Sequence, residues 1–359
     1  MQIAFTEAQI AIRDEAAKLL AEAASSQRVR AVVAQGASHD DALWARVSGE
    51  LGWCALLVPE ERGGLGLGCV ELAILMEETG RRLAPLPVLS TLGLALPYLL
   101  AAPDSDTRGA LLAGIADGTL IASLADATAS ARRHGDGFIL HGAPCLVPDG
   151  AIADAILLPA HLEGDGAALF VLRPGDIAPV TSLDPTRGLA RLSFDGAVID
   201  GDLCLGIGLD LAVAKARARI ALAAECLGGA QSCLDITLAY IAERVQFGRR
   251  IASFQAIKHR CAELSVRIET ARSAVMGAAF LADAGGDGLA QEAAFAKALA
   301  AETFCRAAEE AIQLHGGVGF TWEYDPQLFF KRAQANAALL GGSDALYAEI
   351  AETLLGSAA

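Results

Sequence analysis

The sequence predicts a mainly α-helical protein with a β middle domain, flanked by an N-terminal helical domain and a C-terminal four-helix bundle. Apolar residues recur at helical spacing toward both ends of the chain. Between these regions, short apolar runs, some of them alternating, are separated by Gly, Pro and Asp, which is typical of a small β-barrel or sheet. The expected domain boundaries are residues 1–118, 119–204 and 205–359.

Length and composition support this organisation. The chain has 359 residues, more than one hydrophobic core usually serves, so we expect two or three subdomains. Apolar residues make up 53% of the chain, which favours extensive burial and large subunit interfaces. The net charge is −15, and no basic stripe is present to meet phosphates, so the sequence excludes a nucleic-acid partner.

Cysteine and histidine usage indicates neither disulfides nor a metal site. The eight cysteines form no C-x-x-C pair and mostly lie in apolar helical patterns, as expected for buried thiols in a reducing compartment. The start of the chain lacks the features of a signal peptide. The nearest approach to a membrane span, residues 86–102, is broken by Pro87 and Pro97. We therefore expect a cytoplasmic protein.

The first helix is expected to begin at Glu7, because Thr6 and Gln9 form a capping-box pattern. Further helical patterns in the N-terminal region cover residues 40–51, 69–81, 92–100 and 107–116. Strand-like runs follow at residues 137–142, 155–158, 168–172 and 189–194. In the last of these runs, Leu192 and Phe194 alternate with polar residues, as one face of a sheet requires.

The C-terminal region shows two long apolar stripes at helical spacing. The first consists of Ile220, Leu227, Leu234, Leu238 and Ile241. The second consists of Ile257, Cys261, Leu264, Ile268, Ala271 and Val275. Two more helices are expected over residues 289–314 and 325–339. Together these helices predict the bundle.

Two segments of the bundle carry the functional signal. The first is RVQFG at residues 244–248, followed by Ile251 and by Phe254-Gln255. The second is QLHGGVG at residues 313–319, where a long helical pattern ends in glycines. Glycines at such a position allow a positive φ and a close approach to a ligand or another chain.

Together these segments resemble the two FAD-binding signatures of the acyl-CoA dehydrogenase family, R-x-x-F-G-x-x-(I/L)-x-x-(F/H)-Q and Q-x-x-G-G-x-G. The resemblance extends over nearly the whole chain and implies the fold of that family. It also implies FAD as cofactor, bound mainly by a neighbouring subunit. The residues that the resemblance assigns to the cofactor are Arg244, Gln246, Phe247, Ile251, Phe254, Gln255, Gln313, Gly316 and Gly317.

The resemblance further implies an acyl-CoA substrate, desaturated at the α,β bond with hydride transfer to FAD. The electron-transferring flavoprotein would be the acceptor. The chain would work in a homo- or hetero-tetramer with another acyl-CoA dehydrogenase chain. Some family members that act on steroid side chains are hetero-oligomers in which one chain lacks the catalytic Glu, and residues 319–325 resemble that subgroup.

The residue that should act as general base is missing. In the family it is a Glu at a fixed distance after the second signature, and here that position is Leu340. An alternative position directly precedes Arg219 and is Ala218. Neither side chain can accept a proton. The flavin-facing segments also depart from the family, since residues 123–127 lack the usual Thr and Pro148 has no N–H to donate.

We therefore expect a subunit that completes a partner's FAD site but is inactive without that partner. The alternatives are an active homotetramer with a relocated base, a flavin-dependent enzyme that abstracts no α-proton (a monooxygenase or a nitroalkane-type oxidase on this fold), and a non-catalytic scaffold subunit. Glu225, alone in an apolar helical run, and Asp344 are the candidate relocated bases. Glu225 could instead pair with a residue of the bundle, such as Lys258 or Arg260.

Two further side chains near these positions are candidates for the site. Glu349 is another carboxylate near Leu340, although a solvated helix residue is the expected role. Arg219 could line the thioester pocket as a substrate residue or anchor a carboxylate of its own chain. His315 and His259 are expected to be packing residues rather than catalytic groups.

Overall fold

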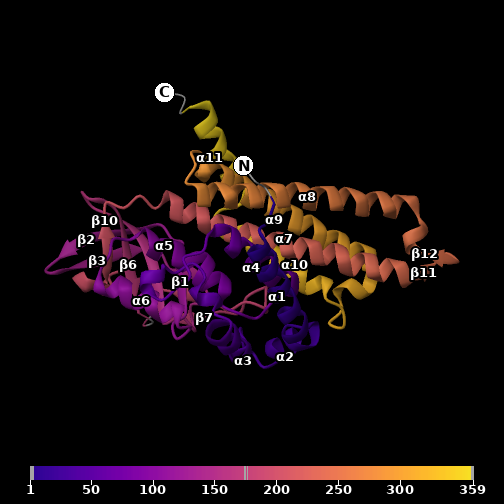
Figure 1. Cartoon of the computed structure of the whole chain (residues 1–359), viewed down its shortest axis with the longest axis horizontal. Coiled ribbons are helices and arrows are strands. Elements are labelled where there is room, and N and C mark those ends of the chain that lie inside the picture. Colours follow the sequence, from indigo (N-terminus) through magenta and orange to yellow (C-terminus); the bar gives the residue numbers. More distant parts are fainter. Residues whose placement is uncertain (1–3, 174, 176, 357–359) are drawn as a thin grey trace. The chain divides into compact units, whose positions relative to one another are not determined.

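The computed structural model describes residues 4–173, 175 and 177–356. The chain divides into two compact units, each of which is described by itself. One comprises Met1–Ala31, Ala73–Ala84 and Arg219–Ala359, and the other comprises Val32–Leu72 and Pro85–Ala218. The predicted fold class, helical at both ends with a β middle domain, is confirmed (Figure 1). The three predicted domain boundaries stay a prediction, because the two units follow spatial contacts and not chain order.

The N-terminal helices begin where the sequence indicates. Helix α1 starts at Glu7, and the Thr6 hydroxyl and the Gln9 side chain form the expected reciprocal cap. The predicted helix over residues 40–51 is an α-helix that continues into a π-helical turn. The α-helices of this region are α1 Glu7–Ala23, α2 Ser26–Ala34, α3 Asp41–Ala45, α4 Cys69–Arg82, α5 Leu96–Ala101 and α6 Asp106–Ala116. Short helical turns lie at Arg46–Glu50, Trp53–Ala55, Glu60–Arg62 and Leu89–Ala95.

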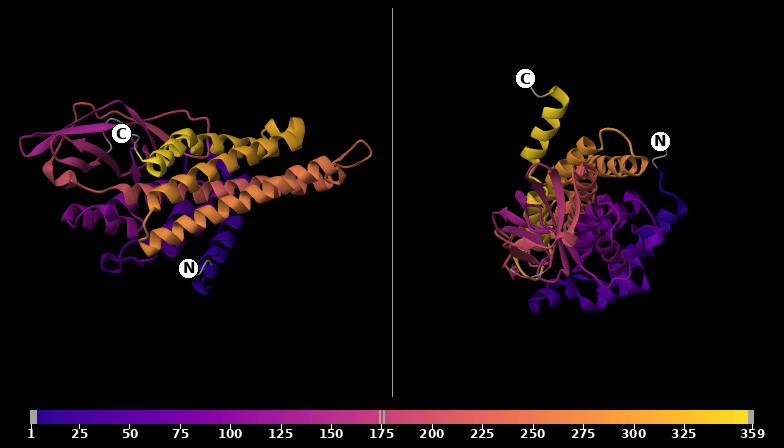
Figure 2. Two further views of the ribbon diagram at one scale, coloured as in Figure 1. Left: turned by 90° about the horizontal axis from the view of Figure 1, so that it is seen from above. Right: turned by 90° about the vertical axis from the view of Figure 1, so that its left-hand side faces the viewer.

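The middle region forms a seven-stranded sheet with the strand order β10-β6-β5-β2-β3-β9, in which β1 pairs parallel to β5. A smaller sheet has the order β4-β8-β7. The strands are β1 Ala122–Leu124, β2 Ala129–His134, β3 Gly137–Gly142, β4 Cys145–Pro148, β5 Ala155–Leu162, β6 Gly166–Leu172, β7 Ile177–Pro179, β8 Leu189–Leu192, β9 Val198–Ile199 and β10 Cys204–Ile207. The curled sheet, magenta in Figure 2, encloses a core around Phe138 and Phe170, whose rings meet edge to face.

The C-terminal helices lie side by side around α9, which packs against α8, α10 and α11 (Figures 1 and 2). Their bounds are α7 Ala212–Glu243, α8 Gln255–Ala284, α9 Leu289–His315, α10 Pro326–Ala338 and α11 Ser343–Leu355. The predicted α8 seam is buried from Cys261 to Val275. Helix α11 was not expected, although Leu346 and Ile350 at helical spacing carry a signal for it.

The prediction that Leu238 belongs to the buried stripe of α7 is wrong. Leu238 is 43% exposed, whereas Thr237 is 2% exposed. The buried face of this part of α7 runs through Leu234, Thr237 and Ile241, which keeps the same helical period. The Thr237 hydroxyl can be buried because it donates to the Cys233 carbonyl.

Helices α4 and α7 cross at a distance that only glycine allows. A Cβ at Gly228 would lie 1.9 Å from the Glu77 carbonyl oxygen, and one at Gly80 would lie 2.1 Å from the Glu225 carbonyl oxygen. This reciprocal contact fixes the rotation of α7 about its axis, and therefore the directions in which its polar side chains point.

No helix in the described part of the chain is long and apolar enough to cross a membrane.

Candidate functional site

The first signature forms an exposed β-hairpin. Strands β11 Val245–Gln246 and β12 Arg249–Arg250 pair antiparallel. The two connecting residues, Phe247 and Gly248, have φ values of 55° and 76°. Positive φ at both central residues defines the type I′ turn, whose twist matches that of the strands. The Phe247 side chain is 91% exposed, so the turn presents an aromatic ring that does not belong to the core.

Two aromatic contacts join residues of this hairpin to Phe254. The rings of Phe247 and Phe254 meet edge to face with centroids 6.2 Å apart. The guanidinium of Arg249 lies 3.9 Å from the centroid of the Phe254 ring, in a cation–π contact. These contacts join the hairpin to the start of α8 and restrict the orientation of both phenylalanine rings.

The second signature forms the end of α9 and the tight turn that follows it, Gly316–Phe320. Gly316 has a φ of 65° and a ψ of −143°, a conformation that is open to glycine alone. A Cβ at Gly316 or Gly317 would meet no atom within 4 Å. The backbone at these two positions is therefore exposed to open space, as a close approach by a ligand requires.

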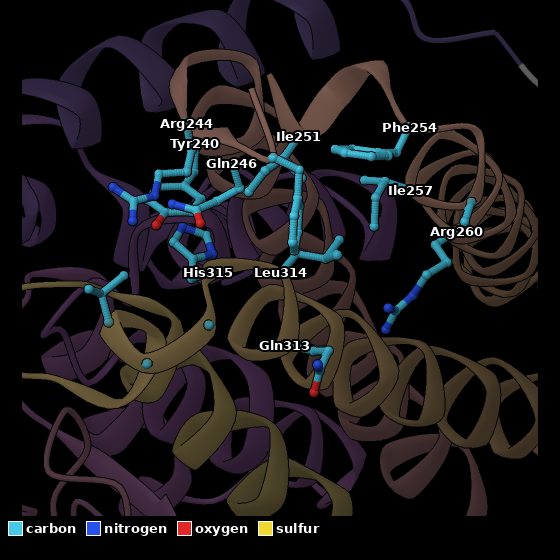
Figure 3. Close-up of a pocket in the computed structure, with 15 residues that line it drawn as sticks. Tyr240, Arg244, Gln246, Ile251, Phe254, Ile257, Arg260, Gln313, Leu314 and His315 are labelled. Carbon is cyan, nitrogen blue, oxygen red and sulfur yellow. The ribbon is translucent and has the colours of Figure 1, made fainter. Parts of the chain in front are cut away.

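The two signatures meet in one cavity of about 630 Å³ (Figure 3). Eight of the nine residues that the sequence assigned to a cofactor line it, namely Arg244, Gln246, Phe247, Ile251, Phe254, Gln313, Gly316 and Gly317. Gln255, the first residue of α8, is exposed to solvent and does not line the cavity.

The cavity also contains residues that were not assigned to it from the sequence: Tyr240, Ala256, Ile257, Arg260, Leu314, His315 and Val318. Helical spacing is the signal that could have found them. Tyr240 lies one turn before Arg244, and Arg260 lies one turn after Ile257. None of the lining residues in the described part of the chain is acidic. In a chain with a net charge of −15, this composition favours an anionic ligand.

His315 forms one wall of the cavity as a neutral side chain. Its ring stacks on Tyr240 with centroids 4.3 Å apart. Its Nδ1 lies 2.6 Å from the Ala311 carbonyl oxygen, which can only accept, so we assign the proton to Nδ1. Burial lowers the pKa of His315, and the hydrogen bond to Ala311 offsets part of that effect. His315 is thus a hydrogen-bonded packing residue, as the sequence predicts.

The position that resembles that of the usual base holds an apolar side chain in a constrained turn. Leu340 is 2% exposed and has a φ of 57°, and Gly341 follows with a φ of 100°. The fully buried Lys297 donates from Nζ to the carbonyl oxygens of Ala337 at 2.9 Å and Gly341 at 2.5 Å. Lys297 therefore satisfies carbonyl groups at the C-terminal end of α10 and fixes the turn. Burial lowers the pKa of Lys297.

Arg219 binds a carboxylate of its own chain. Its two terminal nitrogens donate to the two carboxylate oxygens of Glu349, both at 2.7 Å. Arg219 is 3% exposed, so this bidentate pair links α7 to α11 at a buried guanidinium. The structure therefore shows Arg219 bound to a carboxylate of its own chain. A contact between Arg219 and the thioester stays a prediction.

Glu225 pairs with residues of the bundle, as expected, but the two examples named from the sequence, Lys258 and Arg260, are wrong. Its Oε1 accepts from Arg332 at 3.1 Å and its Oε2 accepts from Asn336 at 2.8 Å. The side chain points toward α10 because the α4–α7 crossing fixes the rotation of α7. Lys258 is exposed, and Arg260 binds Glu310 instead.

Of the remaining positions singled out from the sequence, Asp344 is the one that carries a carboxylate. Asp344 is exposed in the first turn of α11. Ala218 is fully buried on α7. In the β region, the Ser123 hydroxyl donates to the Pro148 carbonyl oxygen at 2.5 Å. The hydroxyl and the carbonyl thus form a hydrogen bond with each other within the β region.

Matches to known proteins identify the class to which this fold and site belong. The N-terminal domain of acyl-CoA dehydrogenases matches residues 6–119, and the C-terminal domain of acyl-CoA dehydrogenases matches residues 208–355. The chain belongs to the acyl-CoA dehydrogenase family. The members of this family are FAD-dependent oxidoreductases that act on CH–CH bonds, and the cofactor is FAD.

Individual relatives cover nearly the whole chain. The acyl-CoA dehydrogenase IpdE2 of Mycobacterium tuberculosis is 38% identical over 330 residues, 92% of each chain. A chain of the ChsE4-ChsE5 complex from Mycobacterium tuberculosis superposes with a TM-score of 0.92 at 26% identity and covers 100% of both chains. A variant of the Tcur3481-Tcur3483 steroid ACAD gives a TM-score of 0.87 at 28% identity, covering 98% of this chain and 99% of that one.

Proposed function

We propose that this chain is a subunit of an acyl-CoA dehydrogenase that completes the FAD site of a partner chain and lacks a general base of its own. The reaction is the α,β-desaturation of a bulky acyl-CoA thioester. Similarity to a steroid ACAD, and to a complex of two different chains, supports both the bulky substrate and the hetero-oligomer. Electrons would leave through an electron-transferring flavoprotein.

One contrast carries this proposal. The cofactor signatures form an exposed cavity, whereas the position of the usual base is a buried leucine. An exposed aromatic turn with positive φ does not stabilise an isolated chain, because it neither fills the core nor relieves strain. Such a turn contributes to binding when another chain or its cofactor covers the aromatic ring.

The residues of the cavity suit the adenosine diphosphate half of FAD. Arg244 offers a cation, Gln246 and Gln313 offer amide groups, and the bare backbone at Gly316 and Gly317 allows close approach. Phe254 and Ile251 offer apolar surface for a base. When bound, the flavin accepts the hydride that leaves the β-carbon.

The groups weighed as relocated bases are poorly suited to proton abstraction. Arg332 and Asn336 occupy both oxygens of Glu225, and Arg219 occupies both oxygens of Glu349. A general base needs a lone pair directed at the substrate. Within the described residues no such restraint is seen on Asp344, and it remains the candidate if the chain is active alone.

The test is co-expression with an acyl-CoA dehydrogenase chain that carries the family Glu, followed by an FAD count per assembled complex. The proposal predicts half as many FAD molecules as chains, with turnover in the complex only. Loss of a positioned base costs about 10²–10⁴-fold in rate, so the isolated chain should be slower by that factor. One FAD per chain together with full activity of the isolated homo-oligomer would contradict the proposal.

A further inference from the structure

Arg260 is a second cation in the cavity that neither signature contains. Figure 3 shows Arg244 and Arg260 on opposite sides of the cavity, with Ile251, Ile257 and Leu314 between them. The cavity thus offers two guanidinium groups separated by apolar surface. An apolar or aromatic ring with polar groups at both ends is the matching ligand shape.

The Arg260 guanidinium is held in place from behind. Its Nη2 lies 2.5 Å from Oε2 of Glu310, a carboxylate on α9 that is 4% exposed. The other oxygen, Oε1, lies 2.6 Å from Nη2 of Arg306. Two arginines therefore share one buried carboxylate, and Arg306 also lies 3.9 Å from Glu309. Arg306 does not line the cavity, so Arg260 is the arginine of this cluster that a ligand in the cavity can reach.

This arrangement pre-organises a donor. A free arginine loses side-chain entropy when it binds a ligand, whereas Arg260 is already restrained by Glu310. Its planar fork has five N–H donors, and contact with one carboxylate oxygen leaves others for oxygen or nitrogen acceptors. The side chain of Arg260 is 37% exposed, so these donors are accessible from the cavity.

We propose that Arg260 is a further binding residue for the adenosine diphosphate half of FAD, and that Glu310 is its positioning residue. The inference rests on the proposed FAD role of this cavity. It adds a contact at the side opposite Arg244, where the ribose or adenine offers acceptors. Glu310 contributes through Arg260 and does not line the cavity itself.

Arg306 provides a matched control. Arg260→Gln and Arg306→Gln each remove one arginine from the same carboxylate and leave the other in place. Both variants keep Glu310 paired with one arginine, and Arg306→Gln also removes the 3.9 Å pair with Glu309. Only Arg260→Gln changes the cavity. Circular dichroism and the Tm of each variant show whether they fold equally well.

The measurement uses the full-length chain and ADP as the probe, by isothermal titration calorimetry, together with FAD retained by the assembled complex. We expect Arg260→Gln to weaken ADP binding about tenfold, the effect of one hydrogen bond to a charged group. Arg306→Gln should change ADP binding less than twofold.

Equal effects of the two substitutions, or no effect of Arg260→Gln on a wild-type chain that binds ADP, would overturn the inference and leave the FAD site standing. Failure of the wild-type chain and of its complexes to bind ADP or FAD would overturn both. A third variant, Glu310→Gln, should weaken ADP binding less than Arg260→Gln, because the guanidinium remains but is less restrained.

Discussion

Arg332 on α10 and Glu225 on α7 form an ion pair, with Nη1 and Oε1 3.1 Å apart and both residues at most 4% exposed. Asn336 donates to the second carboxylate oxygen from the next turn of α10. The pair links two helices of the bundle through a charge that neither could bury alone. Glu225 is therefore a structural residue in this arrangement, although its apolar surroundings in the sequence also suit a base.

Removing one member of this pair should destabilise the fold. We expect Arg332→Met to lower the free energy of unfolding by about 3–5 kcal/mol, because it leaves a buried carboxylate without its cation. Urea denaturation followed by circular dichroism measures this. The double variant Arg332→Met with Glu225→Gln should recover part of the loss. A double variant that is as unstable as the sum of both single changes would show that the pair is not coupled.

Lys297 should make the free energy of unfolding rise with pH in the alkaline range. Its pKa in the folded chain is lowered below the ordinary 10.5 by burial. At a pH between the lowered pKa of Lys297 in the folded chain and its ordinary pKa in the unfolded chain, the unfolded chain binds more protons. Rising pH in this range therefore favours the folded state. We expect wild type to gain stability over Lys297→Met as the pH rises from neutral toward 10.5. The comparison is made by urea denaturation at several pH values.

The exposed residue Lys258 gives the control for that comparison. Lys258→Met makes the same substitution at an exposed position, so any effect of replacing a lysine by methionine that does not depend on burial appears in both variants. A difference for Lys297→Met that is constant over the same pH range would contradict the burial effect.

Phe247 should matter for FAD and not for folding. Because the ring is 91% exposed, Phe247→Ala should change the free energy of unfolding by less than about 0.5 kcal/mol. FAD binding by the assembled complex should weaken about tenfold, since the ring lines the cofactor cavity. Phe320, 69% exposed and absent from the cavity lining, is the control, and Phe320→Ala should retain FAD. Equal FAD loss in both variants would argue against a specific role for the hairpin.

Gly228 should tolerate no side chain. A Cβ there would lie 1.9 Å from the Glu77 carbonyl oxygen, so Gly228→Ala must separate α4 from α7. We expect a loss of about 1–3 kcal/mol in the free energy of unfolding. Gly277 on α8 has no atom within 4 Å of its Cβ position. Gly277→Ala should therefore stabilise the chain by about 0.5–1 kcal/mol. Similar Tm shifts in both variants would refute the close crossing.

Local features of this protein could be predicted from the sequence. The capping residues Thr6 and Gln9 fix the start of α1 through hydrogen bonds within one turn. The apolar seam of α8 and the glycine end of α9 likewise depend on neighbours a few residues away. The two cofactor signatures could be found because each is a short segment whose chemistry depends on spacing alone.

The partners of the buried charges could not be predicted in this way. Glu225 and Arg332, like Arg260 and Glu310, are far apart in the chain and meet only when helix faces are brought together. The same holds for Lys297 beneath the Leu340 turn. Sequence patterns by themselves determined most of the helices and strands and the family signatures, and they predict that the usual base is absent. The tertiary structure decided which charges pair, because the rotation of each helix is set by close packing, as at Gly80 and Gly228.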